Sequence, residues 1–148
     1  MGFDQNFPNS SYSGTYDLRG NATEPLLTSD AGVQVAYTIG TEAGNVITVA
    51  CQFKDSAGND IAYPVGVMQY LATSDTGQTL KAAATSLAAG TDGTIALELT
   101  SNSLWYAISE ADGDLDIAIG DASGAATYYL VTVLPSGALS ISSVITFA

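Results

Sequence analysis

Short stretches in which apolar and polar residues alternate follow one another from residue 33 to the C-terminus, and turn signals separate them. In residues 94–100 the alternation is clean and places Ile95, Leu97 and Leu99 on one face. The preceding Asp92-Gly93 pair is a strong turn signal. A period of two residues is typical of a half-buried strand, so this pattern predicts an all-β chain.

The predicted strands recur at roughly 8–12-residue spacing, which is typical of an antiparallel sandwich or barrel. We expect about eight or nine of them. Most lie in residues 33–38, 46–53, 65–71, 94–100, 104–108, 115–119, 128–134 and 139–147. The alanine-rich stretch at 80–88 is the one place where a short helical turn competes with a strand.

Residues 1–29 differ from the rest, because they are polar and turn-rich and show no clear period. We therefore divide the chain into an extended N-terminal arm, 1–29, and a β-sandwich domain, 30–148. One interpretation of the arm is a frayed terminus. The other is a segment that orders on a neighbouring subunit, since a disordered tail is usually poor in aromatic residues. Its anchors would be Phe3, Phe7, Tyr12 and Tyr16.

The formal net charge is −12, from 15 acidic residues against three basic ones. A surface of this sign repels nucleic-acid phosphates and anionic lipids, so we expect neither nucleic acid nor membrane as a partner. Solubility explains the acidity, and a basic partner surface or peripheral cations are the functional alternative.

Histidine is absent, which removes the commonest general base and the commonest metal ligand. The single cysteine, Cys51, lies in an apolar run and is expected to be a buried thiol. A carboxylate pair of the glycosidase kind is the remaining enzymatic alternative. We expect no enzymatic activity and no catalytic, cofactor or metal site.

The densest acidic stretch, residues 110–116, spaces Asp112, Asp114 and Asp116 as a calcium loop does. Ile117 stands where such a loop has its glycine, and no helices are predicted to flank the stretch. A turn that feeds a half-solvated strand explains the same residues and is the interpretation we favour.

Two aromatic pairs, Trp105-Tyr106 and Tyr128-Tyr129, offer a ligand platform. Neighbours in a strand point to opposite faces, so one ring of each pair is expected in the core.

The stretch from Val49 to Ala62, with Lys54 followed by Asp55-Ser56-Ala57-Gly58-Asn59-Asp60, resembles bacterial and phage Ig-like repeats. Gly90-Thr91-Asp92-Gly93-Thr94 is similar to a later element of those repeats. The resemblance implies an Ig-like β-sandwich over residues 33–100. The chain departs from this pattern after residue 104, where further strands follow.

The C-terminal half, especially residues 109–117, 129–137 and 144–148, resembles small virion proteins of tailed bacteriophages, among them capsid decoration (cement) proteins. That resemblance implies a protein on the capsid surface of the virion, made in the host cytoplasm. It implies a homo-oligomer, with a trimer favoured, whose partner is the major capsid protein. An Ig-like carbohydrate- or receptor-binding module of a phage tail or fibre is the alternative.

Overall fold

The computed structural model describes residues 32–81 and 83–148, of which Val33–Ala148 form a compact unit. The predicted arm, with Phe3, Phe7, Tyr12 and Tyr16, lies outside the described residues.

The described chain consists of strands joined by turns, and no helix occurs in it. The strands are β2 (Gln34–Ile39), β3 (Val46–Lys54), β4 (Gly66–Ala72), β5 (Ser86–Ala89), β6 (Thr94–Thr100), β7 (Leu104–Ile108), β8 (Asp114–Gly120), β9 (Ala126–Val133), β10 (Leu139–Ile141) and β11 (Ile145–Phe147). The all-β prediction is confirmed. Residues 32–81 and 83–148 include no helix of the length and apolarity that crossing a membrane requires.

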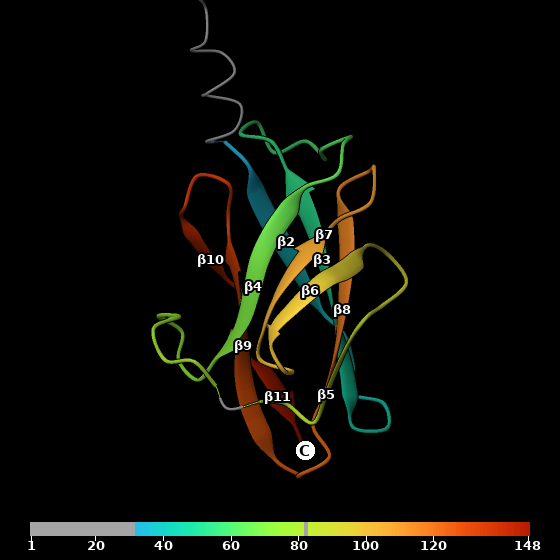
Figure 1. Cartoon of the computed structure of the whole chain (residues 1–148), viewed down its shortest axis with the longest axis vertical. Coiled ribbons are helices and arrows are strands. Elements are labelled where there is room, and N and C mark those ends of the chain that lie inside the picture. The colour runs from blue at the N-terminus through green and yellow to red at the C-terminus, as the bar shows by residue number, and fades with distance from the viewer. Residues whose placement is uncertain (1–31, 82) are drawn as a thin grey trace, which may run out of the picture. The chain divides into compact units, whose positions relative to one another are not determined.

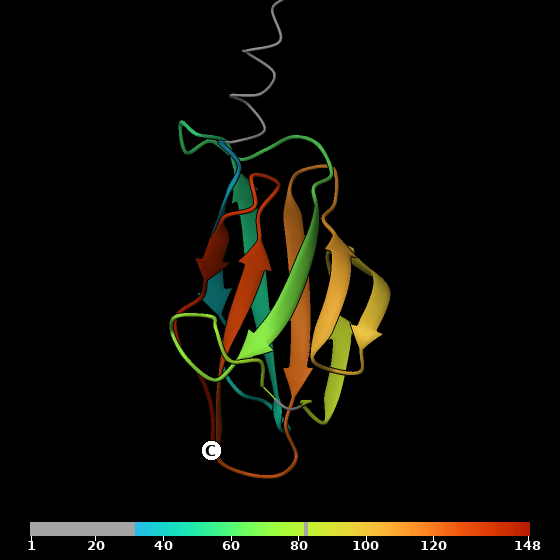
Figure 2. The same ribbon diagram turned by 60° about the vertical axis from the view of Figure 1, so that its left-hand side comes forward.

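The strands form two antiparallel sheets that face each other (Figures 1 and 2). One sheet has six strands in the order β10-β9-β4-β7-β6, with β11 paired to the other end of β9. The other has four strands in the order β2-β3-β8-β5. This arrangement is a β-sandwich.

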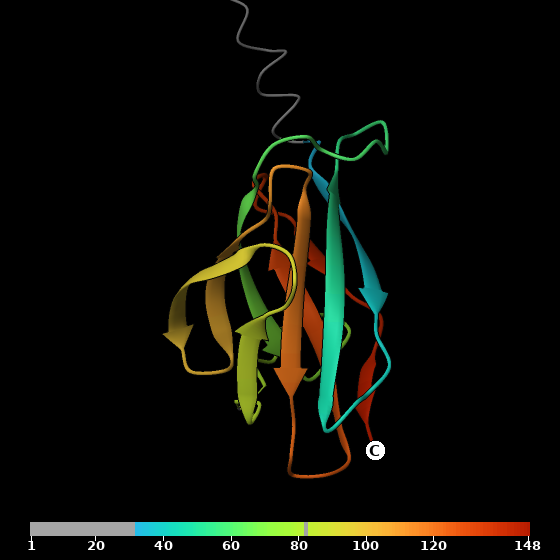
Figure 3. The same ribbon diagram turned by 90° about the vertical axis from the view of Figure 1, so that its right-hand side faces the viewer.

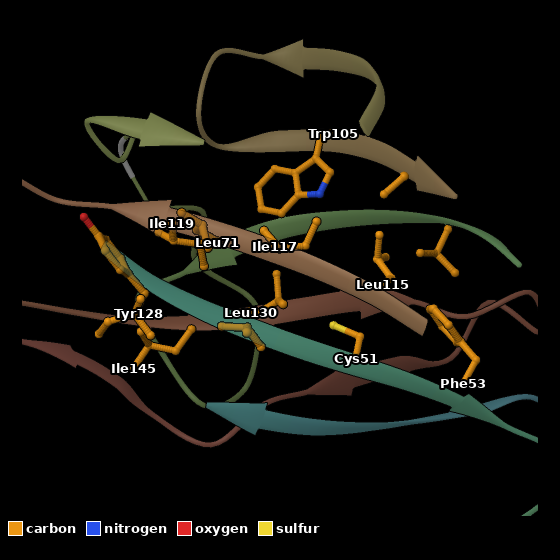
Figure 4. Packing of buried hydrophobic residues seen from close by; sticks show 14 of the residues in the cluster. Cys51, Phe53, Leu71, Trp105, Leu115, Ile117, Ile119, Tyr128, Leu130 and Ile145 are labelled. Atoms are coloured by element: carbon orange, nitrogen blue, oxygen red, sulfur yellow. The ribbon is translucent and has the colours of Figure 1, made fainter. Parts of the chain in front are cut away.

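The core forms from the inward-pointing residues of both sheets (Figure 4). Alternate residues of β3 and β8 are buried, and all of them except Cys51 are branched or aromatic, which suits a pleated strand that packs on a second sheet. The largest fully buried side chains include those of Trp105, Tyr128, Phe53 and Phe147. The rings of Tyr128 and Phe147 meet edge to face at 5.6 Å between centroids.

A chain of hydrogen bonds crosses this core. The indole Nε1 of Trp105 donates to Oε1 of Gln69 at 3.0 Å, and Nε2 of Gln69 donates to Oγ1 of Thr132 at 3.0 Å. The hydroxyl of Tyr37 donates to the same Oγ1 at 2.9 Å. Because Tyr37 belongs to the four-stranded sheet and the other three residues to the six-stranded sheet, these bonds tie the two layers together.

The prediction that Ile95, Leu97 and Leu99 share one face is wrong. The pairing of β6 with β7 shifts between Ile95 and Leu97 and again between Glu98 and Thr100. A bulge inserts one residue and so reverses the side on which the following residues lie. Ile95 packs against the core, whereas Leu97 and Leu99 are exposed.

Two further predictions need correction. The single strand predicted at 139–147 is divided into β10 and β11, which pair with opposite ends of β9. The described residues therefore contain ten strands, where eight or nine were expected. The short helical turn at 80–88 does not form in the described residues of that stretch. Leu80 instead bridges to Ala72, and Ser86 begins β5.

Cys51 is a buried free thiol, as predicted. Its Sγ accepts a 3.7 Å contact from Nε2 of Gln69, and burial raises the pKa of the thiol from 9.0 to about 12. Thiolate is the reactive form, so the folded protein should not react with a thiol reagent at pH 8. We expect one thiol per chain to react only after urea unfolds the domain. Stoichiometric labelling of the native chain would show that Cys51 is accessible.

Candidate docking face

The outward surface of the six-stranded sheet carries a row of apolar side chains. Paired residues of neighbouring antiparallel strands lie on the same face, so the register identifies the row directly. From one edge to the other, the pairs run through five strands. We call these residues the apolar row: Leu97, Tyr106, Met68, Val133 and Leu139.

Four members of the apolar row are among the most exposed large hydrophobic residues of the domain. The exposed fraction is 57% for Leu97, 48% for Leu139, 37% for Tyr106 and 36% for Met68. Single exposed apolar residues are normal on protein surfaces. A contiguous line that spans a whole sheet is instead a mark of an interaction site.

A second line of apolar residues lies beside the apolar row, and a turn of the same chain covers it. Tyr70 pairs with Leu104 and with Val131, and Val131 pairs with Ile141. The turn after β4 lies over this line, since the hydroxyl of Tyr70 donates to the carbonyl of Gly77 at 2.7 Å. This covered line borders the apolar row, so apolar residues continue beyond the row on the same face of the sheet.

The side chain of Tyr106 occupies space that a glycine on the neighbouring strand leaves open. A Cβ at Gly66 would lie 2.1 Å from the Tyr106 hydroxyl oxygen, so any larger residue there would displace the ring. The hydroxyl end of the Tyr106 side chain therefore lies over Gly66 of β4.

The outward surface of the four-stranded sheet has a different character. Its outward positions on β3 and β8 are mostly occupied by small, polar and charged residues, with Val46 as the exception, and they include Ala50, Gln52, Lys54, Asp114 and Asp116. A sandwich normally presents such residues to water on both outer faces. Only the six-stranded sheet is apolar on both of its faces, which is typical of a sheet covered on both sides.

Charge is also unevenly distributed. Glu98 is the one charged residue within the strands of the six-stranded sheet, and its carboxylate accepts a hydrogen bond from the Asn102 backbone N–H. The acidic residues instead gather at the start of β8. Burial first, and then repulsion from nearby aspartates such as Asp112 and Asp92, raises the pKa of Asp114. The apolar row is thus neutral on a strongly acidic molecule.

The acidic stretch takes the form that we favoured, a turn that feeds a strand. The Glu110 N–H donates to the carbonyl of Asp114 at 2.8 Å, Gly113 has a φ of 86°, and Asp114 begins β8. Across residues 32–81 and 83–148, no group of three or more acidic or cysteine side chains is placed to hold a metal ion.

A second polar cluster lies at the turn after β8. The buried carboxylate of Asp121 accepts hydrogen bonds from the Tyr128 hydroxyl and from the Ser123 N–H, the latter at 2.9 Å. The Ser123 hydroxyl bond, foremost among several causes, lowers the pKa of Asp121. Nζ of Lys81 lies 5.1 Å from the centre of the Tyr128 ring. These contacts fix the turn between β8 and β9, which is a structural role.

The aromatic pairs divide as predicted. Trp105 and Tyr128 are fully buried, and their neighbours Tyr106 and Tyr129 point outward. The sequence predicts that one ring of each pair points outward, but it does not say which ring, and it does not predict the apolar row. One signal was present, since Met68, Leu104 and Ile108 make strands β4 and β7 apolar on both faces.

Comparison with protein-family models and with curated proteins finds no match to this chain.

Proposed function

We propose that this protein is a structural virion protein that binds the outer surface of a phage capsid and stabilises neighbouring major capsid subunits. The observation that carries the proposal is the apolar row, which runs without a charged residue through five of the six strands and has four exposed members. A decoration protein needs no active site. It needs a rigid core and a face that gains free energy when a partner covers it.

The chemistry of the face favours a protein partner. Nucleic acid and anionic lipid are bound through basic side chains, and the outward positions of the six-stranded sheet carry none. Protein interfaces instead have cores depleted of charge and enriched in aromatic residues and methionine. Tyr106 and Met68, paired at the middle of the apolar row, fit such a core.

The aromatic residues in the sequence of the predicted arm support the same proposal. An aromatic-bearing extension that orders on a neighbouring subunit would add wrapped surface to a compact docking face. If capsid occupancy stays unchanged after deletion of residues 1–20, the arm takes no part in capsid binding. That result would exclude its anchors Phe3, Phe7, Tyr12 and Tyr16.

Truncation of Tyr106 tests the docking face. We expect Tyr106→Ser to weaken binding to capsids that lack the protein by about 30-fold or more, because truncating an aromatic anchor costs roughly 2 kcal/mol or more. Co-sedimentation with those capsids, at a series of protein concentrations, measures the change.

The matched control is Ala50→Ser, on the outer face of the other sheet, which should bind capsids as the parent does. Gly66→Ala is a second probe, since it displaces the Tyr106 ring without removing it. Equal binding by Tyr106→Ser and the parent would exclude this face. Glycan binding that depends on Tyr106, without capsid binding, would favour the tail or fibre module instead.

A further inference from the structure

The four-stranded sheet ends in a strand whose outer edge is uncovered among the described residues. Figure 3 shows β2 at one edge of this sheet and β5 at the other. β2 pairs with β3 in continuous register over six residues, from Gln34 opposite Lys54 to Ile39 opposite Val49. It contains no bulge, no proline and no charged residue.

The other edges of the sandwich are protected against pairing with a further strand. β6 carries two bulges and Glu98, which are devices that keep a further strand from pairing. β5 has four residues, and β10 and β11 have three each. β2 is therefore the longest regular edge in the described part of the chain.

The register shows which backbone groups face this edge. The Gly40 N–H donates to the carbonyl of Thr48 at 2.8 Å, so Gly40 and Thr48 form a hydrogen-bonded pair. Such pairs alternate along an antiparallel ladder with pairs whose backbone groups point away from each other. Val35, Tyr37 and Ile39 are in the second class. Each turns both its N–H and its carbonyl toward the open edge.

The side chains of the same three residues are incompletely covered. Val35, Tyr37 and Ile39 point inward and pack against the core, yet they are only half-buried. Their inward-pointing neighbours on β3, such as Val49 and Phe53, are fully buried. The open side of the sandwich thus exposes hydrogen-bonding groups and apolar surface together.

We propose that β2 pairs antiparallel with β2 of a second copy of this chain, with Tyr37 on the twofold axis. In this register Val35 of one copy stands opposite Ile39 of the other, and every edge-facing N–H and carbonyl of the three residues gains a partner. Opposed β-branched residues also stabilise antiparallel pairs. Interfaces of this self-complementary kind are the commonest in homo-oligomers.

Charge permits a second copy to approach this edge. Two chains of net charge −12 repel each other, so they meet most easily where neither presents an acid. The edge formed by Gln34–Ile39 is neutral throughout. The proposed dimer replaces the trimer that the family resemblance implies, and it does not depend on capsid binding or on the apolar row.

Cross-linking of the full chain in solution tests the register. With Tyr37 on the axis, Ala36 of one copy faces Thr38 of the other in a pair that is not hydrogen-bonded, with about 4.5 Å between Cα atoms. That distance lies within the roughly 4.4–6.8 Å that a disulfide spans, whereas the diagonal Ala36–Ala36 and Thr38–Thr38 distances of roughly 7–8 Å do not. Mild oxidation of Ala36→Cys mixed with Thr38→Cys should therefore give a covalent dimer.

Each variant oxidised alone should stay monomeric on a non-reducing gel, as should the parent, in which Cys51 is buried. Self-linkage of either single variant, or no linkage in the mixture, would overturn the Tyr37-centred pairing.

Native mass spectrometry gives the second readout. The parent and the control Thr38→Ser should be dimers, and dimer formation should strengthen with added salt as repulsion is screened. Ile39→Pro removes an N–H that faces the edge, so it should give a folded monomer, with Val35→Lys as a second variant if the proline disturbs folding. A parent that is monomeric or trimeric would overturn the proposal, whatever its capsid binding.

Discussion

Replacing Trp105 with alanine should destabilise the domain by about 4 kcal/mol, because truncation of a buried tryptophan leaves a cavity that the core only partly fills. Trp105 is fully buried between the sheets, in the same core cluster as Leu71 and Ile117 (Figure 4). Typical domains are stable by roughly 5–15 kcal/mol, so the variant would be close to unfolding at room temperature. Urea denaturation followed by tyrosine fluorescence measures the change in midpoint.

Part of this cost is polar. The substitution leaves Oε1 of Gln69 without the hydrogen bond from Trp105, and a buried unsatisfied acceptor costs roughly 1–3 kcal/mol. Trp105→Phe helps to separate the two contributions, since it keeps much of the ring volume while it removes the donor. We expect its effect to be about half that of Trp105→Ala, given these two magnitudes.

Tyr106→Ala is the matched control, since it removes an aromatic ring from the same strand on the opposite face. The Tyr106 ring is partly exposed, so its loss should cost about 1 kcal/mol or less. Equal destabilisation by the two alanine variants would mean that the outward face contributes as much to folding as the core does. The apolar row would then be a structural surface and not a docking face.

The prediction that one ring of each aromatic pair lies in the core depends only on the alternation of side chains within a single strand. It assigns neighbouring residues to opposite faces, which is why the division of Trp105 from Tyr106 could be predicted. The alternation within β7 does not predict which residue accepts the hydrogen bond from the Trp105 indole N–H. Gln69 and Thr132 are polar residues in different strands, and only the pairing of β4 with β9 brings them together in the core.

The apolar row was beyond prediction for the same physical reason. Met68 and Val133 are far apart in the sequence, and they become neighbours through strand register, which turns and bulges set. The bulges in β6 have no signature in the sequence, so the alternation places Leu97 on the face of Ile95, which the structure contradicts. Face assignment within a regular strand was accessible from the sequence, and surfaces built across strands were not.

Strongly alkaline solution should unfold the domain through two groups that bridge its layers, the half-buried Tyr37 and the buried Cys51. Burial raises the pKa of Tyr37 from 10.0 to about 12, against hydrogen bonds to Ser140 and Thr132 that lower it, and burial likewise raises the pKa of Cys51 from 9.0 to about 12. Both groups keep their protons in the folded state at pH values where the unfolded chain loses them. Stability from these two groups is therefore complete below pH 9 and is lost as the pH rises toward 12.

One pKa unit corresponds to about 1.4 kcal/mol, so the two groups together withdraw on the order of 5 kcal/mol by pH 12. That loss is comparable with the whole stability of an ordinary domain. Urea titrations at pH 8, 10 and 11.5 should show a steady fall in the free energy of unfolding. Cys51→Ala costs some packing at pH 8 but removes one of the two titrating groups, so its stability should fall less steeply. A parent whose stability is flat from pH 8 to 11.5 would show that Tyr37 and Cys51 ionise as easily when folded as when unfolded. The hydrogen bond between Tyr37 and Thr132 would then not be the link between the two sheets.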